Sequence, residues 1–538
     1  MTLPSPQPHR LVPPSTFFAV ADIGSAEEVA AASDGDLWPS TWADDDHLYA
    51  ACGDGLGFDG EGAWSDIVVN RISGSPETGL RGERLASGRD VAPIWTDPAR
   101  YNSKPTGFVA VDGNGDGKDE LYLAVQDLYS VPGPDIFNEA PAAAIVRSTD
   151  YGRTWTAPSE PQFTDHQFTT VMFVDLGRSN QHASRLGEPG MVYAVGLDHN
   201  WRTSYSGAVP DPTDLYLARV PSHSVLDRAE WQFYAGDSQG VPRWSGALGD
   251  RVPVLTDTTK HHPEHFPVSG GSGVIAQGGV VYVPALDRFL YSTWSEFTLE
   301  LYEAPKPWGP WRHVVCRDFG PYPWVGPDGE HPRHGGYGAT MPSKFLAADG
   351  RTAWLQSNWF VHASTYAGRT YRFSLRRVAL EPPRPPVAAP PAGTNLARLD
   401  GATPFGSAAR TAHFEVLNDG ASQRAEDSWS GTRRELDFWG YQWPYVLTVA
   451  RVRYCAGPYD PAGGWFAEPP RIEVRVDGVW RDAHATVSPD YVPGPTAGRL
   501  RTFEFTFDPV RANGVRLVGP PGGDEAYTAI SELEVYSR

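Results

Sequence analysis

Residues Ser148-Thr-Asp150-Tyr-Gly152-Arg-Thr-Trp155 are the stretch of this sequence that says most about its fold. They follow a short apolar run at 143–147, which has the length of a β-strand. Asp and Gly two residues apart favour a tight turn, because Asp accepts hydrogen bonds from the backbone ahead of it and Gly tolerates a positive φ. We therefore expect a β-hairpin, with Trp155 packed beneath its turn.

Comparable apolar runs, separated by turn residues, recur from Thr16 to about residue 380, for example at 66–72, 106–111, 120–125, 168–174, 191–195 and 279–283. The 56 Gly and 50 Pro of the chain favour turns over long helices. An all-β sandwich, β-helix or propeller would suit such spacing. Because the runs form five groups, one about every 60 to 70 residues, we expect a five-bladed β-propeller.

Residues 381–393 read Glu-Pro-Pro-Arg-Pro-Pro-Val-Ala-Ala-Pro-Pro-Ala-Gly and mark a domain boundary. So many prolines make the segment a stiff linker. We expect a disordered lead at 1–15, the propeller at 16–380 and a second β domain at 394–538. The apolar runs of that second domain predict β-strands.

The charge and the cysteines exclude several classes of protein. The formal net charge of −20 argues against nucleic-acid binding and favours a neutral, polar substrate. Cys52, Cys316 and Cys455 are far apart, so we expect neither a disulfide framework nor a Cys-x-x-Cys metal site. No apolar run reaches the roughly 20 residues that span a bilayer, so we expect no membrane partner. Residues 1–14 lack the apolar core of a signal peptide, which leaves a cytoplasmic location open.

Two acids stand out in the stretch Asp34-Gly-Asp36-Leu-Trp38, which is followed by a polar turn and by His47-Leu-Tyr-Ala-Ala-Cys-Gly-Asp54. The pattern predicts two short strands, with Asp36 and Trp38 on one face because side chains alternate. Paired carboxylates and flat rings are what a sugar-cleaving site needs, the acids for proton transfer and the rings for sugar faces. The alternative is that both acids only cap turns.

Further polar and aromatic residues fall where strands of the expected propeller begin or end. A loop role in solvent is the alternative for each. As substrate contacts besides Trp38 we expect Lys104, Asp127, His199, Trp201 and Glu296.

Two segments have the residues of metal sites. Asp112-Gly-Asn114-Gly-Asp116-Gly-Lys-Asp119-Glu120 places oxygen ligands at alternate positions with Gly at the sharp turn, which predicts a structural calcium site or else an ordinary hairpin turn. His261-His262-Pro-Glu264-His265 fits no standard zinc spacing, so we expect an active-site rim loop there. We expect no cofactor for catalysis.

Several motifs resemble known families. The stretch 148–155 matches the Ser-x-Asp-x-Gly-x-Thr-Trp box of sialidase-like propellers. The segments around Asp36 and Asp54, Lys104-Pro-Thr-Gly107, Tyr302-Glu-Ala-Pro-Lys-Pro-Trp308-Gly-Pro-Trp311 and 345–350 resemble a bacterial five-bladed propeller family that includes endo-D-arabinanases and was long known only as a domain of unknown function. The resemblance covers roughly residues 16–380, and the Trp308 motif is its most distinctive part.

This resemblance implies a glycoside hydrolase that cleaves a furanosidic polysaccharide of the arabinan or arabinogalactan type. Its catalytic acids fall on Asp36 and Asp54. One would be the general acid, and the other would activate water, giving inversion, or attack carbon, giving retention; we favour inversion. We expect a monomer that acts on a polysaccharide outside the cell or in the cell envelope. A non-catalytic glycan-binding propeller and a polysaccharide lyase are the alternatives.

Residues 394–538 resemble the discoidin-like, galactose-binding-like jelly roll of many carbohydrate-binding modules. The resemblance rests on Asn395-Leu-Ala, on Asn418-Asp-Gly with Trp429, and on the closing run 530–536. It implies either sugar binding or a purely structural module. The candidate sugar contacts are the aromatic residues Trp439, Tyr441, Trp443 and Trp465.

Overall fold

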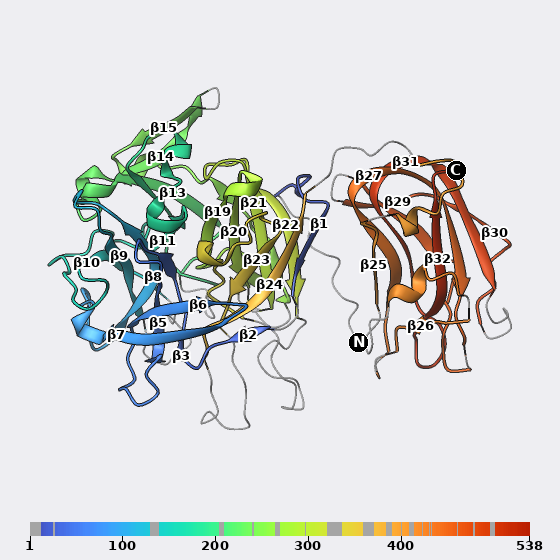
Figure 1. The fold of residues 1–538 in the computed structure, drawn as a ribbon, viewed down its shortest axis with the longest axis horizontal. Coiled ribbons are helices and arrows are strands. Elements are labelled where there is room, and N and C mark those ends of the chain that lie inside the picture. The colour runs from blue at the N-terminus through green and yellow to red at the C-terminus, as the bar shows by residue number, and fades with distance from the viewer. Residues whose placement is uncertain are drawn as a thin grey trace. The chain divides into compact units, whose positions relative to one another are not determined.

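The computed structural model describes two compact units. The N-terminal unit is Asp22–Ala379, and the C-terminal unit is Leu380–Arg538 together with Pro14–Ala21 (Figure 1). The described residues are 12–538 except 25–26, 130–138, 204–208, 239–240, 264–268, 296, 320–335, 359–370, 383–389, 400, 408–413, 422, 430, 432, 460, 477–478 and 495–500. Within them the regular structure consists of strands and short 3-10 turns, so the all-β prediction is confirmed.

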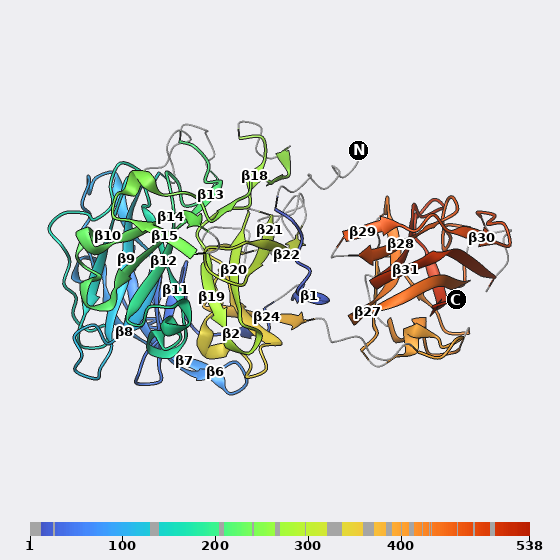
Figure 2. The ribbon, with the colours of Figure 1, turned by 90° about the horizontal axis from the view of Figure 1, so that it is seen from above.

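Antiparallel meanders make up the N-terminal unit, because its short apolar runs are separated by turn residues. The first two meanders consist of β3 (Asp34–Asp36), β4 (Ser40–Trp42), β5 (Leu48–Gly57), β6 (Val68–Ser75) and β7 (Gly79–Ser87), then β8 (Tyr101–Val111), β9 (Glu120–Tyr129) and β10 (Ala142–Ser148). Figure 2 shows β8, β9 and β10 side by side.

Two further meanders form one continuous sheet, because β11 and β19 pair in parallel. Their strands are β11 (Thr170–Asp175), β12 (Met191–Leu197), β13 (Asp214–Pro221), β14 (Gln232–Ser238), β15 (Val241–Ser245) and β16 (Leu255–Thr256), then β19 (Gly279–Val283), β20 (Arg288–Trp294), β21 (Thr298–Ala304) and β22 (Arg312–Asp318). A separate two-stranded ladder joins β17 (Lys260–His261) to β18 (Ser272–Gly273).

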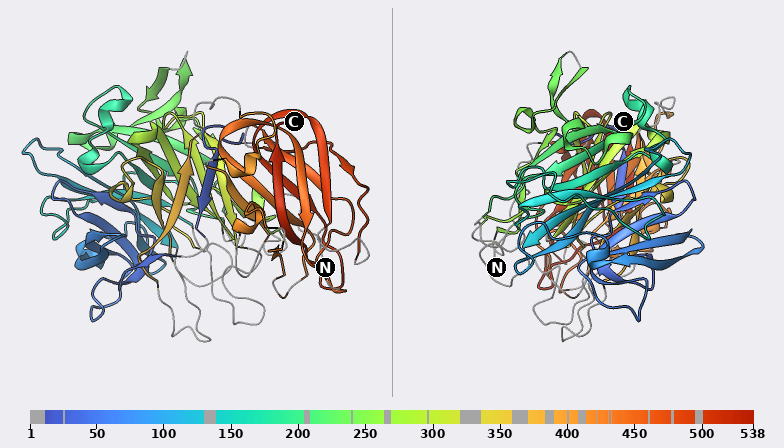
Figure 3. Two further views of the ribbon diagram at one scale, coloured as in Figure 1. Left: turned by 45° about the vertical axis from the view of Figure 1, so that its right-hand side comes forward. Right: turned by 90° about the vertical axis from the view of Figure 1, so that its left-hand side faces the viewer.

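The first and last strands of the N-terminal unit share its remaining sheet. In this sheet β24 (Ser374–Glu381) lies between β1 (Val20–Ile23) and β2 (Val29–Ala30), and β23 (Thr352–Gln356) also pairs with β24. Figure 3 shows these meanders from two further sides. That they are five blades of one propeller stays a prediction.

The turn at Asp150 has the predicted form. The Asp150 carboxylate accepts hydrogen bonds from the Thr154 amide at 2.9 Å and the Thr154 hydroxyl at 2.7 Å. The Trp155 indole donates to the Gly152 carbonyl at 3.0 Å and packs against Phe108, with ring centroids 6.1 Å apart. The local chemistry of the motif is therefore enough to specify the turn.

The C-terminal unit is built on one eight-stranded antiparallel sheet. Its order is β26 (Glu426–Asp427), β32 (Ala529–Tyr536), β27 (Asp437–Ala456), β31 (Thr502–Gly519), β28 (Arg471–Val476) and β29 (Val479–Asp482), with β25 (Thr403–Gly406) on β27 and β30 (Thr486–Ser488) on β31. The long strands β27 and β31 carry register shifts between Gln442 and Leu447 and between Val449 and Arg451. Such irregularities bend a strand.

Three of the predicted sugar contacts in this unit belong to its core. Trp439, Tyr441 and Trp443 have no exposed surface, and the two indoles donate to Thr528 Oγ1 and the Leu396 carbonyl. They alternate along β27, so all three point to the same buried face. A sugar therefore cannot stack on them, and the prediction of exposed loop aromatics is wrong at these positions. Trp465 is half-buried.

No helix among the described residues is long and apolar enough to cross a membrane.

Candidate functional site

Asp36, Asp54 and Lys104 meet where the first two meanders adjoin. Asp36 ends β3 and pairs with Gly53 of β5, so Asp54 follows directly after its strand partner. Lys104 lies on β8, and its ammonium group donates a hydrogen bond to Asp54 Oδ1. The Lys104 side chain is 4% exposed and that of Asp54 is 34% exposed. The structure thus brings the two predicted acids and the predicted lysine into one cluster.

The Asp36 carboxyl is buried and held from one side only. Its Oδ2 accepts a hydrogen bond of 2.8 Å from the Tyr337 hydroxyl. Its Oδ1 has no hydrogen-bond partner among the described residues. A Cβ at position 53 would lie 2.6 Å from this oxygen, so the site requires glycine there. A buried oxygen without a hydrogen-bond partner destabilises the folded state. A functional role is one reason for keeping such a group.

Burial first and then the neighbouring charge of Asp54 raise the pKa of Asp36, which reaches about 7. The charge of Lys104 and the hydrogen bond from Tyr337 oppose this shift. Burial alone would lower the pKa of Lys104, but the charges of Asp54 and Asp36 outweigh it, so the lysine stays an ammonium ion. A carboxyl that titrates near neutral pH can serve as a general acid.

The backbone that carries the acids adopts unusual conformations. Leu37 has φ 72°, Trp38 has φ 51° and Asp54 has φ 42°, values that few residues other than Gly and Asn adopt. Asn358 supports this turn, because its side-chain oxygen accepts a 2.9 Å hydrogen bond from the Leu37 amide. Strain held in this way is typical of active sites.

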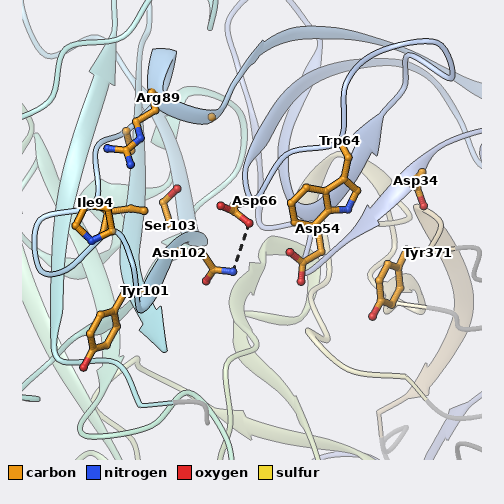
Figure 4. Close-up of a pocket in the computed structure, with 13 residues that line it drawn as sticks. Asp34, Asp54, Trp64, Asp66, Arg89, Ile94, Tyr101, Asn102, Ser103 and Tyr371 are labelled. Atoms are coloured by element: carbon orange, nitrogen blue, oxygen red, sulfur yellow. Dashed lines mark hydrogen bonds between the residues drawn. The ribbon is translucent and has the colours of Figure 1, made fainter. Parts of the chain in front are cut away.

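A cavity of about 700 Å³ opens beside Asp54. Its walls also carry Asp34, Asp66, Trp64, Tyr101, Asn102 and Tyr371, and Figure 4 shows Asp54, Asp66 and Trp64 between the two tyrosines. Asn102 donates to Asp66 at 3.4 Å. Trp64 is 58% exposed, which is unusual for an indole and leaves its face available to a ligand.

The predicted substrate contacts Trp38, Asp127, His199 and Trp201 are not among the residues that line this cavity. Trp38 is fully buried and packs edge-on against Phe58 and Phe373, so it supports the Asp36 turn from inside the core and offers no face to a sugar. Asp127 is also fully buried and accepts two hydrogen bonds from Thr96. The prediction that Trp38 contacts the substrate is corrected on that ground, whereas a substrate contact by Asp127 stays a prediction.

The remaining predicted contacts are Trp201, His199 and Glu296. Trp201 is 6% exposed and packs against Tyr337, with ring centroids 6.0 Å apart, so it contacts the residue that holds Asp36. His199 is partly buried beside His166, at 6.3 Å between ring centroids, and is not among the residues that line the cavity. Glu296 lies outside the described residues.

In the predicted calcium loop the side-chain oxygens accept hydrogen bonds from several separate groups. Asp112 accepts hydrogen bonds from the amides of Gly115 and Gly117, and Asp119 turns away to Ser179 and the Asp44 amide. Glu120 accepts from the Gly113 amide, and Asn114 and Asp116 cap neighbouring amides. Because these oxygens satisfy separate backbone groups, the donor set fits calcium poorly, and a calcium site here stays a prediction.

Sequence reasoning missed Trp64, Asp66, Tyr101, Tyr337 and Tyr371. Trp64 and Asp66 follow Gly60-Glu-Gly-Ala in a glycine-rich loop, and an aromatic residue in such a loop is a signal that could have been used. Tyr337 is 301 residues from Asp36, so no local pattern could connect the two.

Comparison with known proteins adds one family and several distant structures. No curated protein matches the sequence. A solved structure described as a glycoside hydrolase is 10% identical and covers 95% of this chain and 100% of its own, with a TM-score of 0.31. A presumed hydrolase from Bacteroides ovatus is 11% identical over 65% of this chain and 86% of its own, with a TM-score of 0.39. A structure from a Streptococcus pneumoniae beta-galactosidase is 16% identical over 26% of this chain and 98% of its own, with a TM-score of 0.23.

One family model matches residues 32–378, which is more than half of the chain and includes Asp36, Asp54 and Lys104. The protein therefore belongs to the family described as Domain of unknown function (DUF4185).

Proposed function

We propose that the protein is a glycoside hydrolase that cleaves a furanosidic polysaccharide of the arabinan or arabinogalactan type outside the cell or in its envelope. The observation that carries the proposal is the pairing of two unlike carboxyls. Asp36 is buried with a pKa near 7, and Asp54 is held by an ammonium group at the edge of a cavity with aromatic walls. Two carboxyls placed in different environments are the pattern on which acid–base glycoside cleavage depends.

In the proposed reaction Asp36 gives its proton to the glycosidic oxygen as the bond from that oxygen to the anomeric carbon breaks. Asp54 takes a proton from a water molecule whose oxygen forms the new bond to that carbon. Lys104 holds Asp54 in place. General-base action on water, rather than attack on carbon, is our proposal for Asp54. Inversion is therefore the expected stereochemical outcome.

The proposed scaffold is a five-bladed propeller. The antiparallel meanders, the parallel contact of β11 with β19, and the pairing of β24 with β1 and β2 at the two ends of the unit support it. In such a propeller the inner strands surround a channel, and the cluster of Asp36, Asp54 and Lys104 would lie at its mouth.

The charges of the cavity favour a neutral sugar. Asp34, Asp54 and Asp66 line it, and Arg89 is the one basic side chain among the described residues of the lining, so acids outnumber bases there. Acids concentrated in this way repel an acidic sugar. Lys104, which could neutralise one, is already engaged by Asp54. These features support a hydrolase of neutral glycans over a polysaccharide lyase.

The test is the release of reducing ends from a panel of polysaccharides that includes arabinan and arabinogalactan. We expect activity on a furanosidic polymer that is lost in Asp36→Asn and in Asp54→Asn, with binding retained. NMR of the first product anomer reports inversion or retention. Tight binding by all three proteins without turnover on any polymer would contradict the proposal and favour a glycan-binding protein.

Trp64→Ala tests whether the cavity is where the polysaccharide binds. Loss of one stacking surface is worth about 1 kcal/mol, so KM should rise about fivefold while kcat changes little. The free energy of unfolding should be unchanged, because the indole is 58% exposed. Steady-state kinetics and urea unfolding are the measurements, with Trp42→Ala as a matched indole control outside the cavity lining. An unchanged KM in Trp64→Ala would place the substrate elsewhere.

A further inference from the structure

A second cluster of reactive side chains lies in the N-terminal unit apart from the cavity. One ligand atom each from His261, Glu300 and Cys316 lies within 4.8 Å of the other two. Among the described residues this is the one group of three His, Cys, Asp or Glu side chains that could hold a metal ion. None of the three lines the cavity beside Asp54.

These three residues are far apart in the sequence, and the fold brings them together on paired strands. Glu300 on β21 and Cys316 on β22 are direct cross-strand partners, so their side chains share one face of the fourth meander. His261 comes from β17, a short strand that pairs with β18 and precedes that meander in the chain. The segment before β17 is tied to the same face, because Asp257 accepts a 2.8 Å hydrogen bond from the Tyr302 hydroxyl.

Both oxygens of the Glu300 carboxyl face imidazole nitrogens in a buried site. The His261 Nε2 atom lies 3.1 Å from Oε1, and the His313 Nε2 atom lies 2.9 Å from Oε2. The Glu300 side chain has no exposed surface, and the side chains of His261 and His313 are 4% and 13% exposed. A carboxylate taken fully out of water needs hydrogen bonds and compensating positive charge. The Thr298 hydroxyl donates a 3.0 Å hydrogen bond to Oε1, and a divalent cation would add positive charge.

We propose that His261, Glu300 and Cys316 bind a zinc ion and that His313 orients Glu300 as an outer partner. One imidazole, one carboxylate and one thiolate form a donor set that suits zinc and not calcium, which takes oxygen ligands only. Ligand atoms on a tetrahedral zinc ion lie about 3.3–3.8 Å apart, so side-chain rotations of about 1 Å close the site. The zinc ion would fasten β17 to the fourth meander, with its fourth position left to a water molecule.

The experiment uses the purified full chain and zinc or cobalt ions alone. We expect one zinc ion per chain, a higher Tm with zinc than after chelation, and a thiolate-to-cobalt charge-transfer band when cobalt replaces zinc. Cys316→Ser should abolish that band, and Cys455→Ser, at a buried cysteine in the C-terminal unit, should keep it. His261→Ala should lower zinc affinity at least 100-fold, and His484→Ala, an exposed control, should not.

His313→Gln separates the outer partner from the ligands. It should weaken zinc binding about 10- to 100-fold while the cobalt charge-transfer band remains. Zinc that binds Cys316→Ser and His261→Ala as tightly as the unmodified protein, or a cobalt complex without a thiolate band, would overturn the proposal. Neither zinc affinity nor the cobalt band depends on enzyme activity. The zinc proposal can therefore be wrong while the proposed hydrolase function is right, and the hydrolase proposal can be wrong while the zinc site is right.

Discussion

Asp36→Asn is expected to reduce turnover by about 10²- to 10⁴-fold and, at pH 8, to make the protein more stable. The loss of turnover follows because asparagine cannot give up a proton to the leaving oxygen. The gain in stability follows because the native carboxyl is buried, keeps one oxygen without a partner among the described residues, and is next to another carboxylate. An amide of nearly the same shape removes the charge and keeps the hydrogen bond from Tyr337.

The direction of the pH effect follows from the pKa of Asp36. Its ordinary pKa is 3.8, and in the folded protein it rises to about 7. Between these values the folded state binds more protons than the unfolded state, so the free energy of unfolding falls as the pH rises through this window. Above pH 7 the penalty is complete, on the order of 2–4 kcal/mol, and Asp36→Asn removes it. Below pH 4 both states are protonated, and the substitution should be close to neutral.

Urea unfolding at pH 4, 6 and 8 measures the change in the free energy of unfolding. The value of kcat/KM over the same pH range measures the loss of turnover. Wild-type activity should fall as the pH rises through about 7, because Asp36 loses the proton it must donate. Asp59→Asn, at an exposed position outside the cavity lining, is the matched control and should change neither quantity. A stability difference between Asp36→Asn and wild type that does not depend on pH would show that Asp36 is ionised throughout.

The sequence predicted those features of this molecule that depend on neighbours along the chain. The turn at Asp150 is specified within eight residues, and Asp36 and Asp54 are brought together by one short strand pair. Lys104 was singled out because it precedes Pro105-Thr-Gly107 where the next predicted strand begins, and its contact with Asp54 is a finding of the structure.

The features that sequence reasoning missed depend on contacts between distant segments. Tyr337 reaches Asp36 across 301 residues, and His261 reaches Glu300 across 39. Aromatic residues were misjudged for a related reason. Trp38 and Trp439 are of the residue type on which sugars stack, but both are fully buried. Which residues are buried depends on which face of a sheet is covered.

Lys104→Met should damage the site in a different way from Asp36→Asn. It removes the Lys104 ammonium group, which holds Asp54 and whose charge lowers the pKa of Asp36. Without that charge the pKa of Asp36 should rise, so the pH at which activity falls should move above 7. Turnover should drop about 10²-fold or more, because Asp54 is no longer held in position. Removing one partner of a fully buried ion pair costs about 3–5 kcal/mol, and partial exposure of Asp54 reduces this to about 2 kcal/mol.

A double-mutant cycle with Asp54→Asn isolates the ion pair from the loss of the lysine stem. If the pair accounts for the destabilisation, Lys104→Met should cost much less in the Asp54→Asn background than in the wild type. Lys118→Met, at an exposed loop position, is the control and should leave stability and the pH profile unchanged. Equal costs in both backgrounds, together with an unshifted pH profile, would mean that Lys104 stabilises the fold through its packing and has no electrostatic influence on either acid.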